Sequence, residues 1–589
     1  MSLAPPHRSA AQRPPHSHSP VGGPRARAGS WRQWLESADR GRTCLVVLAV
    51  AMVVSIAVVL NETNGATFST DEFLYFVVNR GFDVKTVLSP HNGNLSAVIR
   101  LLYAAVFKVA GPDYAFFRIL LALEIAATAG LFYVLVRRRV GPVAALALTL
   151  PLLFLGSSAD VAINTIGVQH LLCLIACLGA LIALEADSRR GDVLACALLT
   201  IGVATFSIAF AFIAGAGVSV LLREDRRRRA WIFLVPLALY VLWLIAAPKY
   251  SGPGYLGTTS VQLTNLLLIP SFIANAAAAL AAAVTGLSYD FWQTGPAQVV
   301  TYYTWGIPLA AAAAVALVWR VRRGGLNPWF WSYLAIPLVF WLSIVMTIEP
   351  NRYPNSDRYI YGAAVAALLL TAEALRRLRL SGGALAGLLC ASAVAVTGNA
   401  AQLRVDGSIR RASSAQVRSV LTAVELARGR VAPSFLPSAP YPALLFTWAG
   451  GVDPYLEAVK RNGSFAFSVA ELRRQSEGNR ELADSTLAGA LRIHLQPAPR
   501  FNPTARCVVI APGARGLHRF TVRPPGAVLR SAAGGAVTVG RFGSVPTANV
   551  GVLPPRRVYR LVIPRDRSSV PWNVSVPAGV QAVCRESAG

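Results

Sequence analysis

Eleven apolar runs, separated by short turns rich in arginine, constrain what this chain can fold into. Most of them approach the roughly 20 residues that an α-helix needs to cross a bilayer. The 589 residues are 54% hydrophobic and only 14% charged, and the mean hydropathy is +0.49. A soluble globule of this size is less apolar. The sequence therefore predicts an α-helical polytopic membrane protein.

The strongly basic composition reflects membrane topology and not a nucleic-acid partner. The chain has 56 Lys and Arg against 28 Asp and Glu, a net charge of +28. Such a charge is typical of nucleic-acid binders, but here the basic residues cluster in short loops between apolar runs. That placement marks the cytoplasmic side of a membrane protein. Arg32 to Arg42 precede the first run, so the N-terminus is predicted to be cytoplasmic.

The N-terminal region is predicted to be a tail followed by an anchor. Residues 1–30 are rich in Pro, Arg, Ser and His without apolar periodicity, which predicts a disordered cytoplasmic tail. No convincing Ala-x-Ala cleavage site follows the run at 44–60, so this run reads as a membrane anchor and not as a removed signal peptide. Residues 31–400 are then the predicted transmembrane domain.

Arginine clusters order the apolar runs into alternating spans. Arg137–Arg139 and Arg223–Arg229 mark two of the cytoplasmic turns. The predicted spans cover about 43–60, 115–136, 142–156, 168–185, 192–204, 207–222, 230–247, 300–319, 328–347, 360–375 and 381–399.

Two further apolar segments are predicted not to cross the membrane. Residues 95–110, in the first outer loop at 61–114, carry Arg100 and Lys108 and read as an amphipathic helix on the outer surface. Residues 262–286 are rich in alanine and long enough to span. If they did, the arginines after residue 319 would lie outside, so this segment is predicted to stay in the outer leaflet.

The last part of the chain, 401–589, has a different character and is predicted to be an extracytoplasmic β-rich domain. It is polar and rich in Pro and Gly, with short β-type runs at 507–510, 520–522 and 559–563. Regular short strands with turn signals are typical of a β-sandwich. A helical segment at about 412–428 precedes them.

The cysteines agree with this arrangement. Five of the seven lie in apolar runs, where cysteine behaves as a small hydrophobic residue. Cys507 and Cys584 bracket the β-rich region, and an oxidising exterior would let them pair. A disulfide between them is predicted, with two unpaired surface thiols as the alternative.

With this topology, the polar residues that topology does not explain gather on the outer face. Asp71 and Glu72 follow the first span directly. A carboxylate near a membrane surface has its pKa raised by desolvation, which suits a general base. Substrate-binding candidates on the same face are His91, Asn94, Asp160, Lys249, Arg352, Arg358 and Tyr359.

A structural role competes with catalysis for the acidic pair. Ser69-Thr-Asp-Glu72 fits the Ser-x-x-Glu capping box that starts a helix, and acids in a first turn suit the helix dipole. This role would use Glu72 and leave Asp71 free. Asp71 is therefore the predicted base, with Glu72 as its helper or as a metal ligand.

A metal site is a weaker expectation. Glu72, His91 and Asp160 are possible ligands for Mg²⁺, Mn²⁺ or Ca²⁺, but their spacing is irregular. A lone histidine in a turn is usually solvated, and Asp160 also suits a loop acid or an N-cap. His170 is expected to pack at the mouth of its span.

Arginines on the outer face need a reason, because they oppose the positive-inside tendency. Arg352 and Arg358 flank one outer loop beside Tyr353 and Tyr359. Guanidinium groups bind phosphate oxygens in bidentate fashion, so a phosphate at the membrane surface is one explanation. An ion pair between Asp357 and Arg358, with tyrosines of the aromatic belt, is the other. Lys249 and Arg118 are further cations of this kind.

The layout resembles the GT-C superfamily of polytopic glycosyltransferases, which includes protein O-mannosyltransferases, lipid A aminoarabinose transferases and actinobacterial arabinofuranosyl- and mannosyltransferases. The matching features are Asp71-Glu72 in a first outer loop, an interfacial helix, Phe116-Phe-Arg118 at the second span, a tight hairpin of the fifth and sixth spans, and an outer β domain. They cover most of residues 40–400.

The resemblance implies that Asp71 is the catalytic base and that the donor is a polyprenyl-phosphate sugar. The expected acceptor is an extracytoplasmic glycan, lipid or protein. The protein itself is expected in the cell membrane, and no nucleic-acid partner is expected. Attack opposite a phosphate leaving group needs one carboxylate and inverts the anomeric centre. A lipid-sugar flippase, with charges near the midplane, and a non-catalytic polysaccharide-binding scaffold are the alternatives.

Overall fold

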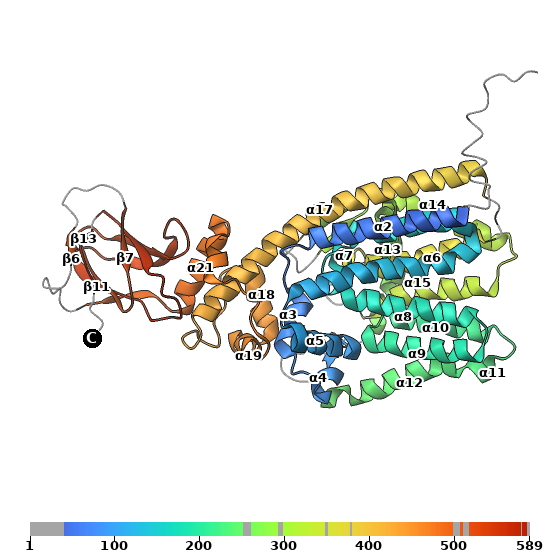
Figure 1. The fold of residues 1–589 in the computed structure, drawn as a ribbon, viewed down its shortest axis with the longest axis horizontal. Coiled ribbons are helices and arrows are strands. Elements are labelled where there is room, and N and C mark those ends of the chain that lie inside the picture. The colour runs from blue at the N-terminus through green and yellow to red at the C-terminus, as the bar shows by residue number, and fades with distance from the viewer. Residues whose placement is uncertain are drawn as a thin grey trace, which may run out of the picture.

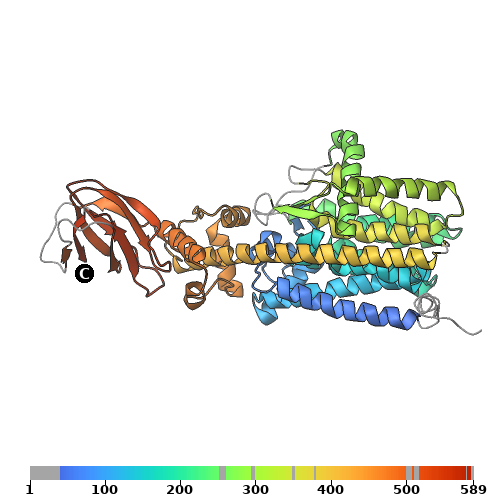
Figure 2. The ribbon, with the colours of Figure 1, turned by 90° about the horizontal axis from the view of Figure 1, so that it is seen from above.

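One long helix, α17 (Gly382–Leu426), joins a bundle of helices to a β-sandwich (Figures 1 and 2). The computed structural model describes residues 40–250, 261–292, 299–347, 352–498, 507–509 and 517–585, apart from 377, 379 and 579. The predicted tail at 1–30 lies outside the described residues. We call the end of the bundle that faces the sandwich, and that carries Asp71, the site end.

Each predicted span corresponds to a helix of the bundle. Among the described residues, eight helices are long and apolar enough to cross a membrane. The predicted fold class, a helical membrane domain with a C-terminal β region, is confirmed. The bundle contains α2 (Arg40–Glu62), α6 (Tyr114–Leu153), α8 (Gly167–Glu185), α9 (Arg189–Thr205), α10 (Ala209–Leu221), α12 (Trp231–Ala246), α14 (Gly306–Arg322), α15 (Pro328–Met346), α16 (Asp357–Leu375) and the first half of α17.

The helix α6 holds two of the predicted spans. Its backbone breaks at Gly141, where φ is 79° and ψ is 170°. Glycine reaches positive φ without the penalty that a Cβ brings, and Pro142 then suits the first position of a new helix. The arginines at 137–139 precede this break, as predicted for a turn at the end opposite the site.

The first loop folds into short elements at the site end. These are α3 (Thr70–Val78), α4 (Val84–Leu88), β1 (Pro90–His91), β2 (Asn94–Leu95) and α5 (Ala97–Ala110). The predicted interfacial helix corresponds to α5, which buries Ile99, Tyr103 and Phe107 and exposes Leu101 and Val109. One apolar face is therefore left outside the protein core.

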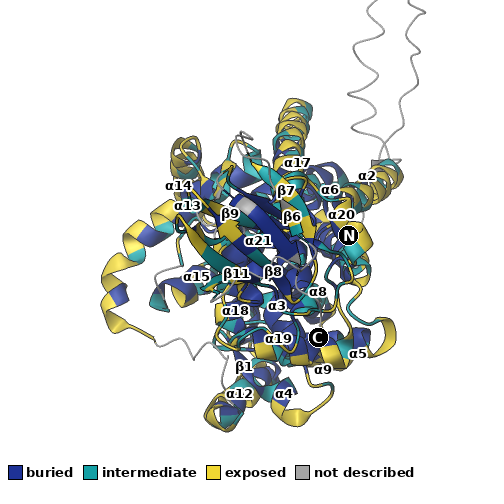
Figure 3. Cartoon of the chain, turned by 90° about the vertical axis from the view of Figure 1, so that its left-hand side faces the viewer, coloured by how far each residue is buried: buried dark blue, intermediate teal, exposed yellow. Residues whose placement is uncertain are grey.

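The segment at 262–286 starts and finishes at the site end of the bundle. It forms a short 3₁₀ turn, η3 (Leu263–Leu268), and α13 (Ile269–Thr285). The backbone N–H of Gln262 donates to Met346 at the site end of α15, and the amide of Asn399 donates to Ala283. Figure 3, viewed along the bundle, shows this segment from the side. These contacts agree with the predicted position, although its length and composition would allow a span.

The border predicted at residue 400 falls inside α17, which continues without interruption to Leu426. Residues after α17 remain helical before the first strand of the sandwich. Aromatic side chains hold these helices against the bundle. Phe446 and Tyr455 pack on Phe73 of α3, with ring centroids 6.0 and 5.6 Å from that of Phe73. The helices are α18 (Pro440–Ala449), α19 (Val452–Asn462), α20 (Val469–Arg473) and α21 (Glu477–Ala490).

The β-sandwich consists of two antiparallel sheets. The five-stranded sheet has the order β5-β11-β8-β13-β6, and the four-stranded sheet has the order β10-β9-β12-β7. Leu529, Val539, Leu561 and Trp572 are buried between them. The strands are β5 (His494–Pro497), β6 (Cys507–Val509), β7 (His518–Val522), β8 (Gly526–Ser531), β9 (Gly535–Gly540), β10 (Ala548–Leu553), β11 (Arg557–Val562), β12 (Trp572–Val576) and β13 (Val580–Arg585).

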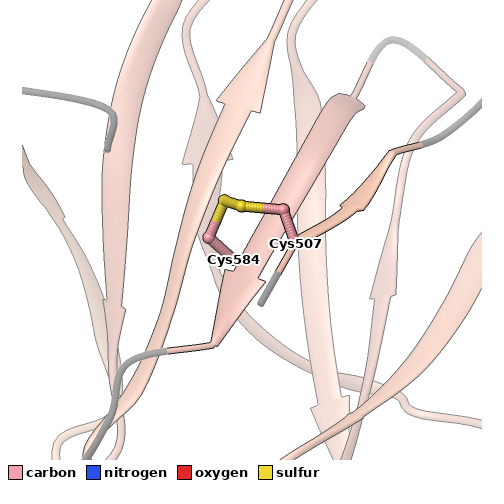
Figure 4. Close-up of a disulfide and its surroundings, with 2 residues drawn as sticks. All are labelled: Cys507 and Cys584. Carbon is pink, nitrogen blue, oxygen red and sulfur yellow. A yellow bond between two sulfur atoms is a disulfide. The ribbon is translucent and has the colours of Figure 1, made fainter. Parts of the chain in front are cut away.

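The predicted disulfide is present. Cys507 of β6 and Cys584 of β13 are directly opposite each other in the sheet and form an S–S bond (Figure 4). The bond attaches the edge strand to its neighbour. The other cysteines are free, and they are Cys44, Cys173, Cys177, Cys196 and Cys390.

Candidate functional site

The acidic pair lies in the first turn of α3, where the two carboxylates have different surroundings. Ser69 and Glu72 form the predicted capping box. Glu72 is completely buried. Its carboxylate accepts hydrogen bonds from the hydroxyl of Thr165 at 2.5 Å, the backbone N–H of Ile166 at 2.7 Å and that of Ser69 at 3.0 Å. Burial raises the pKa of Glu72 to about 7, although these donors lower it.

These contacts leave the Glu72 carboxylate enclosed by protein donors. The structure therefore gives Glu72 the capping role that the sequence left open, and its side chain has no exposure to solvent. The backbone beside it is strained, since Thr70 has a φ of 47°, which is unfavourable for a β-branched residue. Strain of this kind clusters at functional sites.

Asp71 faces away from this enclosure and pairs with His91. Its Oδ2 lies 3.4 Å from Nε2 of His91, and its side chain is 20% exposed. The His91 ring packs against Tyr75, with centroids 4.6 Å apart. Two of the predicted site residues, distant by 20 positions, are thus brought into contact.

The sequence Pro90-His-Asn-Gly-Asn94 explains how His91 is held. Asn92 and Gly93 have φ of 48° and 76° and connect β1 to β2 in a two-residue turn. Asn-Gly favours such turns, because both positions need positive φ. The amide of Asn94 donates to the carbonyls of His91 and Asn92. Asn94 therefore stabilises this hairpin, although it was a candidate for substrate binding.

Positive groups around Asp71 keep its carboxylate ionised. Burial alone would raise the pKa of Asp71, but the charge of His91, 3.4 Å away, followed by that of Arg358, holds it below its ordinary value. Arg358 lies in the first turn of α16 next to Tyr359, with its guanidinium 5.4 Å from the Tyr359 ring. Asp71 and Arg358 thus lie within electrostatic reach of one another.

His170 approaches the site from the first turn of α8. Its Nδ1 lies 3.2 Å from the carbonyl oxygen of Ile166, and its ring packs on Phe206 with centroids 4.3 Å apart. The predicted packing role of His170 is confirmed.

Arg410 connects the site to the long helix α17. Its guanidinium donates to the hydroxyl of Ser69 at 2.8 Å and to the carboxylate of Asp160 at 3.0 Å. The backbone N–H of Asp160 in turn donates to the Asp357 carboxylate at 2.9 Å. Asp160 is therefore held between two elements, α16 and α17, and its carboxylate has a protein partner.

A group of acids lies behind Asp160. Burial and the negative charges of Asp406 and Asp357 raise the pKa of Asp290 well above its ordinary value. One Asp290 oxygen accepts from the hydroxyl of Thr301 at 3.0 Å. A protonated Asp290 relieves repulsion among these carboxylates.

The expected metal site does not fit the arrangement. The Glu72 carboxylate faces Thr165 and Ile166, His91 faces Asp71, and Asp160 faces Arg410. Within the described residues, no group of three or more His, Cys, Asp or Glu side chains is arranged to hold a metal ion. No step of the chemistry is therefore assigned to a cation.

The other predicted cations divide into those that cap helices and one that is exposed. Arg352 donates to the hydroxyl and carbonyl of Thr347 at the end of α15. Arg118 donates to Thr63 and to the carbonyl of Leu60 at the end of α2. Lys249 follows α12 and is exposed. Among these candidates, Arg358 is the cation near Asp71.

Sequence reasoning missed Arg410, because the predicted domain border placed it outside the membrane domain. A signal was present. Gln402, Asp406 and Arg410 recur every four residues and so share one face of a helix. The amide of Gln402 indeed donates to Asp406 at 2.8 Å. A polar stripe that continues an apolar span indicates a helix reaching beyond the membrane.

Solved structures match the chain at low similarity. Crystal structures of ArnT from Cupriavidus metallidurans match in the apo state, with a TM-score of 0.46 and 14% identity over 72% of this chain and 92% of theirs, and bound to undecaprenyl phosphate, with a TM-score of 0.44 and 12% identity over 72% and 88%. The Archaeoglobus fulgidus oligosaccharyltransferase, tethered with an acceptor peptide, matches with a TM-score of 0.40 and 12% identity over 89% of this chain and 76% of that chain.

No family model matches the chain, and no curated protein matches it in sequence. At these identities and TM-scores the matches assign no role to any residue, so each role is argued from the contacts within this chain.

Proposed function

We propose that the chain is a glycosyltransferase that moves a sugar from a polyprenyl-phosphate donor to an acceptor hydroxyl at the outer membrane surface. Asp71 is the general base. The observation that carries the proposal is the placement of an ionised, partly exposed Asp71 beside His91 and within electrostatic reach of Arg358. A base and a phosphate-binding cation are the two groups that this transfer requires.

The reaction balances with these two groups. The acceptor oxygen attacks the anomeric carbon, a new C–O bond forms, and the bond from that carbon to the phosphate oxygen breaks. The acceptor proton passes to the Asp71 carboxylate, and the bonding electrons leave with the phosphate. Arg358 stabilises the charge that develops there. Attack opposite the leaving group inverts the anomeric centre.

A lipid-linked donor agrees with the surface near the site. Leu263, Leu266 and Leu267 of η3 are exposed, and η3 contacts the site end of α15 through Asn265 and Val345. Exposed leucines at this level suit contact with lipid chains. The undecaprenyl phosphate named for one ArnT structure is a lipid of the proposed class.

We infer the orientation from the disulfide and the arginine turns. The Cys507–Cys584 bond requires an oxidising compartment, which supports a β-sandwich outside the cytosol. Arg137–Arg139 lie at the opposite end of the bundle from Asp71, where cytoplasmic turns are expected. The proposed acceptor is therefore a glycan, lipid or protein of the cell envelope.

The decisive experiment replaces Asp71 by Asn in the full chain, reconstituted with a polyprenyl-phosphate sugar and an envelope acceptor. Sugar transfer is expected to fall by at least about 100-fold, as for loss of a general base. Asp113→Asn is the matched control. Asp113 is exposed at the site end of the bundle and is the N-cap of α6, a position that Asn also fills well. Transfer by Asp71→Asn at the level of this control would overturn the assignment.

A further inference from the structure

Two adjoining cavities open at the end of the bundle opposite Asp71. Their volumes are about 320 and 340 Å³. Both are lined by Leu184, Arg223, Trp329 and Arg376, so they form one continuous hollow, which we call the basic cavity. It lies among the turns that connect α8 to α9 and α10 to α12, beside the break in α6, the start of α15 and the end of α16.

Positive charge dominates the lining. Five arginines face the basic cavity, namely Arg138, Arg139, Arg223, Arg229 and Arg376, whereas the lining carboxylates are those of Glu185 and Asp187. Three further acids pair with these arginines from outside the lining, namely Asp192, Asp225 and Glu373. The lining itself therefore carries an excess of positive charge.

Each of the two lining carboxylates pairs with two arginines. Some guanidinium N–H groups of the lining are therefore left without a carboxylate partner. Glu185 pairs with Arg139 and, at 3.6 Å, with Arg138. Asp187 pairs with Arg223 and Arg229, both at 2.7 Å. An arginine offers five N–H donors in a planar fork.

Arg229 is the buried arginine of the lining. It is 6% exposed and pairs with Asp187 and Asp192, while its Nε has no hydrogen-bond partner in the described structure. It therefore adds fixed positive charge beside the basic cavity, and the more exposed arginines are the ones that can contact a ligand.

A purely structural ion-pair network explains only part of this arrangement. Arg139 is 3% exposed and donates to Glu185, Glu373 and Tyr333. It thereby connects α6 to α8, α16 and α15. Arg138 is different, because it is 56% exposed and its closest carboxylate contact is long. Arg376, 33% exposed, forms its one ion pair within the described residues with the neighbouring Glu373. These two guanidiniums are placed to receive a ligand at little structural cost.

The surroundings favour a lipid over a soluble anion. Leu222 lines the cavity and is exposed, as is the adjacent Leu221, and Trp329 lies at the start of α15. Tryptophan at a helix end typically marks the level of the lipid headgroups. Basic pockets between helices at this level bind phosphate-bearing headgroups. We propose that the basic cavity binds the phosphate group of an anionic membrane lipid.

The test measures lipid binding to the purified full chain by native mass spectrometry, with phosphatidylglycerol and phosphatidylcholine as probes. Arg138→Gln combined with Arg376→Gln is expected to weaken phosphatidylglycerol binding about tenfold, as for loss of a charge-assisted hydrogen bond. Arg226→Gln combined with Arg227→Gln is the matched control. It removes the same charge at the same end from exposed residues that do not line the cavity.

Phosphatidylglycerol bound more tightly than phosphatidylcholine, and weakened only by the first pair, supports the proposal. An equal effect of both pairs, or equal binding of the two lipids, overturns it. Inorganic phosphate that displaces the lipid at a similar concentration would assign the cavity to a soluble anion and overturn the lipid assignment. If the first pair lowers the thermal unfolding midpoint without lipid, Arg138→Gln alone, at the more exposed position, decides by the same comparison.

Discussion

The guanidinium of Arg410 lies 3.0 Å from the carboxylate of Asp160, although 250 positions separate them in sequence. Arg410 is 1% exposed and also donates to Ser69, the residue that starts α3. Because Arg410 belongs to α17, the helix that carries the β-sandwich also holds the first turn of α3. The position of Asp71 therefore depends on a residue more than 300 positions away in the chain.

Arg410→Gln is expected to lower the free energy of unfolding by about 3 kcal/mol. Removing one partner of a buried pair leaves the other charge uncompensated. The neighbouring Arg411 is the control, since its side chain is 38% exposed where it pairs with Glu62, and Arg411→Gln should cost less than about 1 kcal/mol. Thermal unfolding in detergent compares the two, and equal shifts would contradict the role of Arg410.

His91→Gln is expected to move the acid limb of kcat/KM to higher pH. His91 and Arg358 hold the pKa of Asp71 below its ordinary value, so the carboxylate stays ionised until the pH falls to this lowered pKa. Without His91 the pKa of Asp71 rises and the carboxylate protonates at a higher pH. The same depressed pKa contributes stability that is present above the unfolded value and is lost as the pH falls through the folded one.

The pH profile of transfer by the full chain measures this shift. His494→Gln, a change of the same kind in the β-sandwich, should leave the profile unaltered, because His494 contacts the carbonyl of Arg492 and is remote from Asp71. An acid limb that stays in place in His91→Gln would separate Asp71 from the reaction.

Local patterns predicted the membrane fold because each one acts over a few residues. The apolar runs predicted the spans, the Ser-x-x-Glu pattern predicted the capping box at Ser69, and the isolated cysteine pair predicted the disulfide. The arginines at 320–323, at the end of α14, predicted an outer position for α13, whose own composition would allow a span. Each of these conclusions depends on hydrophobicity, charge or backbone chemistry within one segment.

The site was less predictable because its contacts join distant elements. Asp160 was a candidate for substrate binding, but its partner Arg410 comes from a helix whose length the polar residues after 400 concealed. Arg352 and Arg358 looked equivalent in sequence, six positions apart in one loop. The fold separates them, since Arg352 caps α15 and Arg358 approaches Asp71.

Arg358→Ala is expected to raise the KM for the polyprenyl-phosphate donor at least about tenfold, with a smaller effect on the KM for the acceptor. The reason is the loss of a charge-assisted contact to the donor phosphate. Arg352→Ala is the control, because Arg352 donates to Thr347 at 2.8 Å instead. Steady-state kinetics with each substrate varied in turn gives both constants, and equal changes in the two would argue against a phosphate contact.

Cys507→Ser is expected to destabilise the β-sandwich and to leave the membrane bundle intact. The bond joins residues 77 positions apart, and closing a loop of that length stabilises a fold by about 4 kcal/mol in the chain-entropy description. Leu529, Leu561 and Trp572 belong to an apolar cluster that the sandwich shares with α21 and the end of α17 and that is separate from the core of the bundle, so the loss should spare the bundle. Limited proteolysis of the full chain should then cleave within 494–585 and spare the helices. Cys390→Ser, at a free and exposed cysteine, should resist as the unaltered chain does, and equal resistance of Cys507→Ser would show that the sheets hold without the bond.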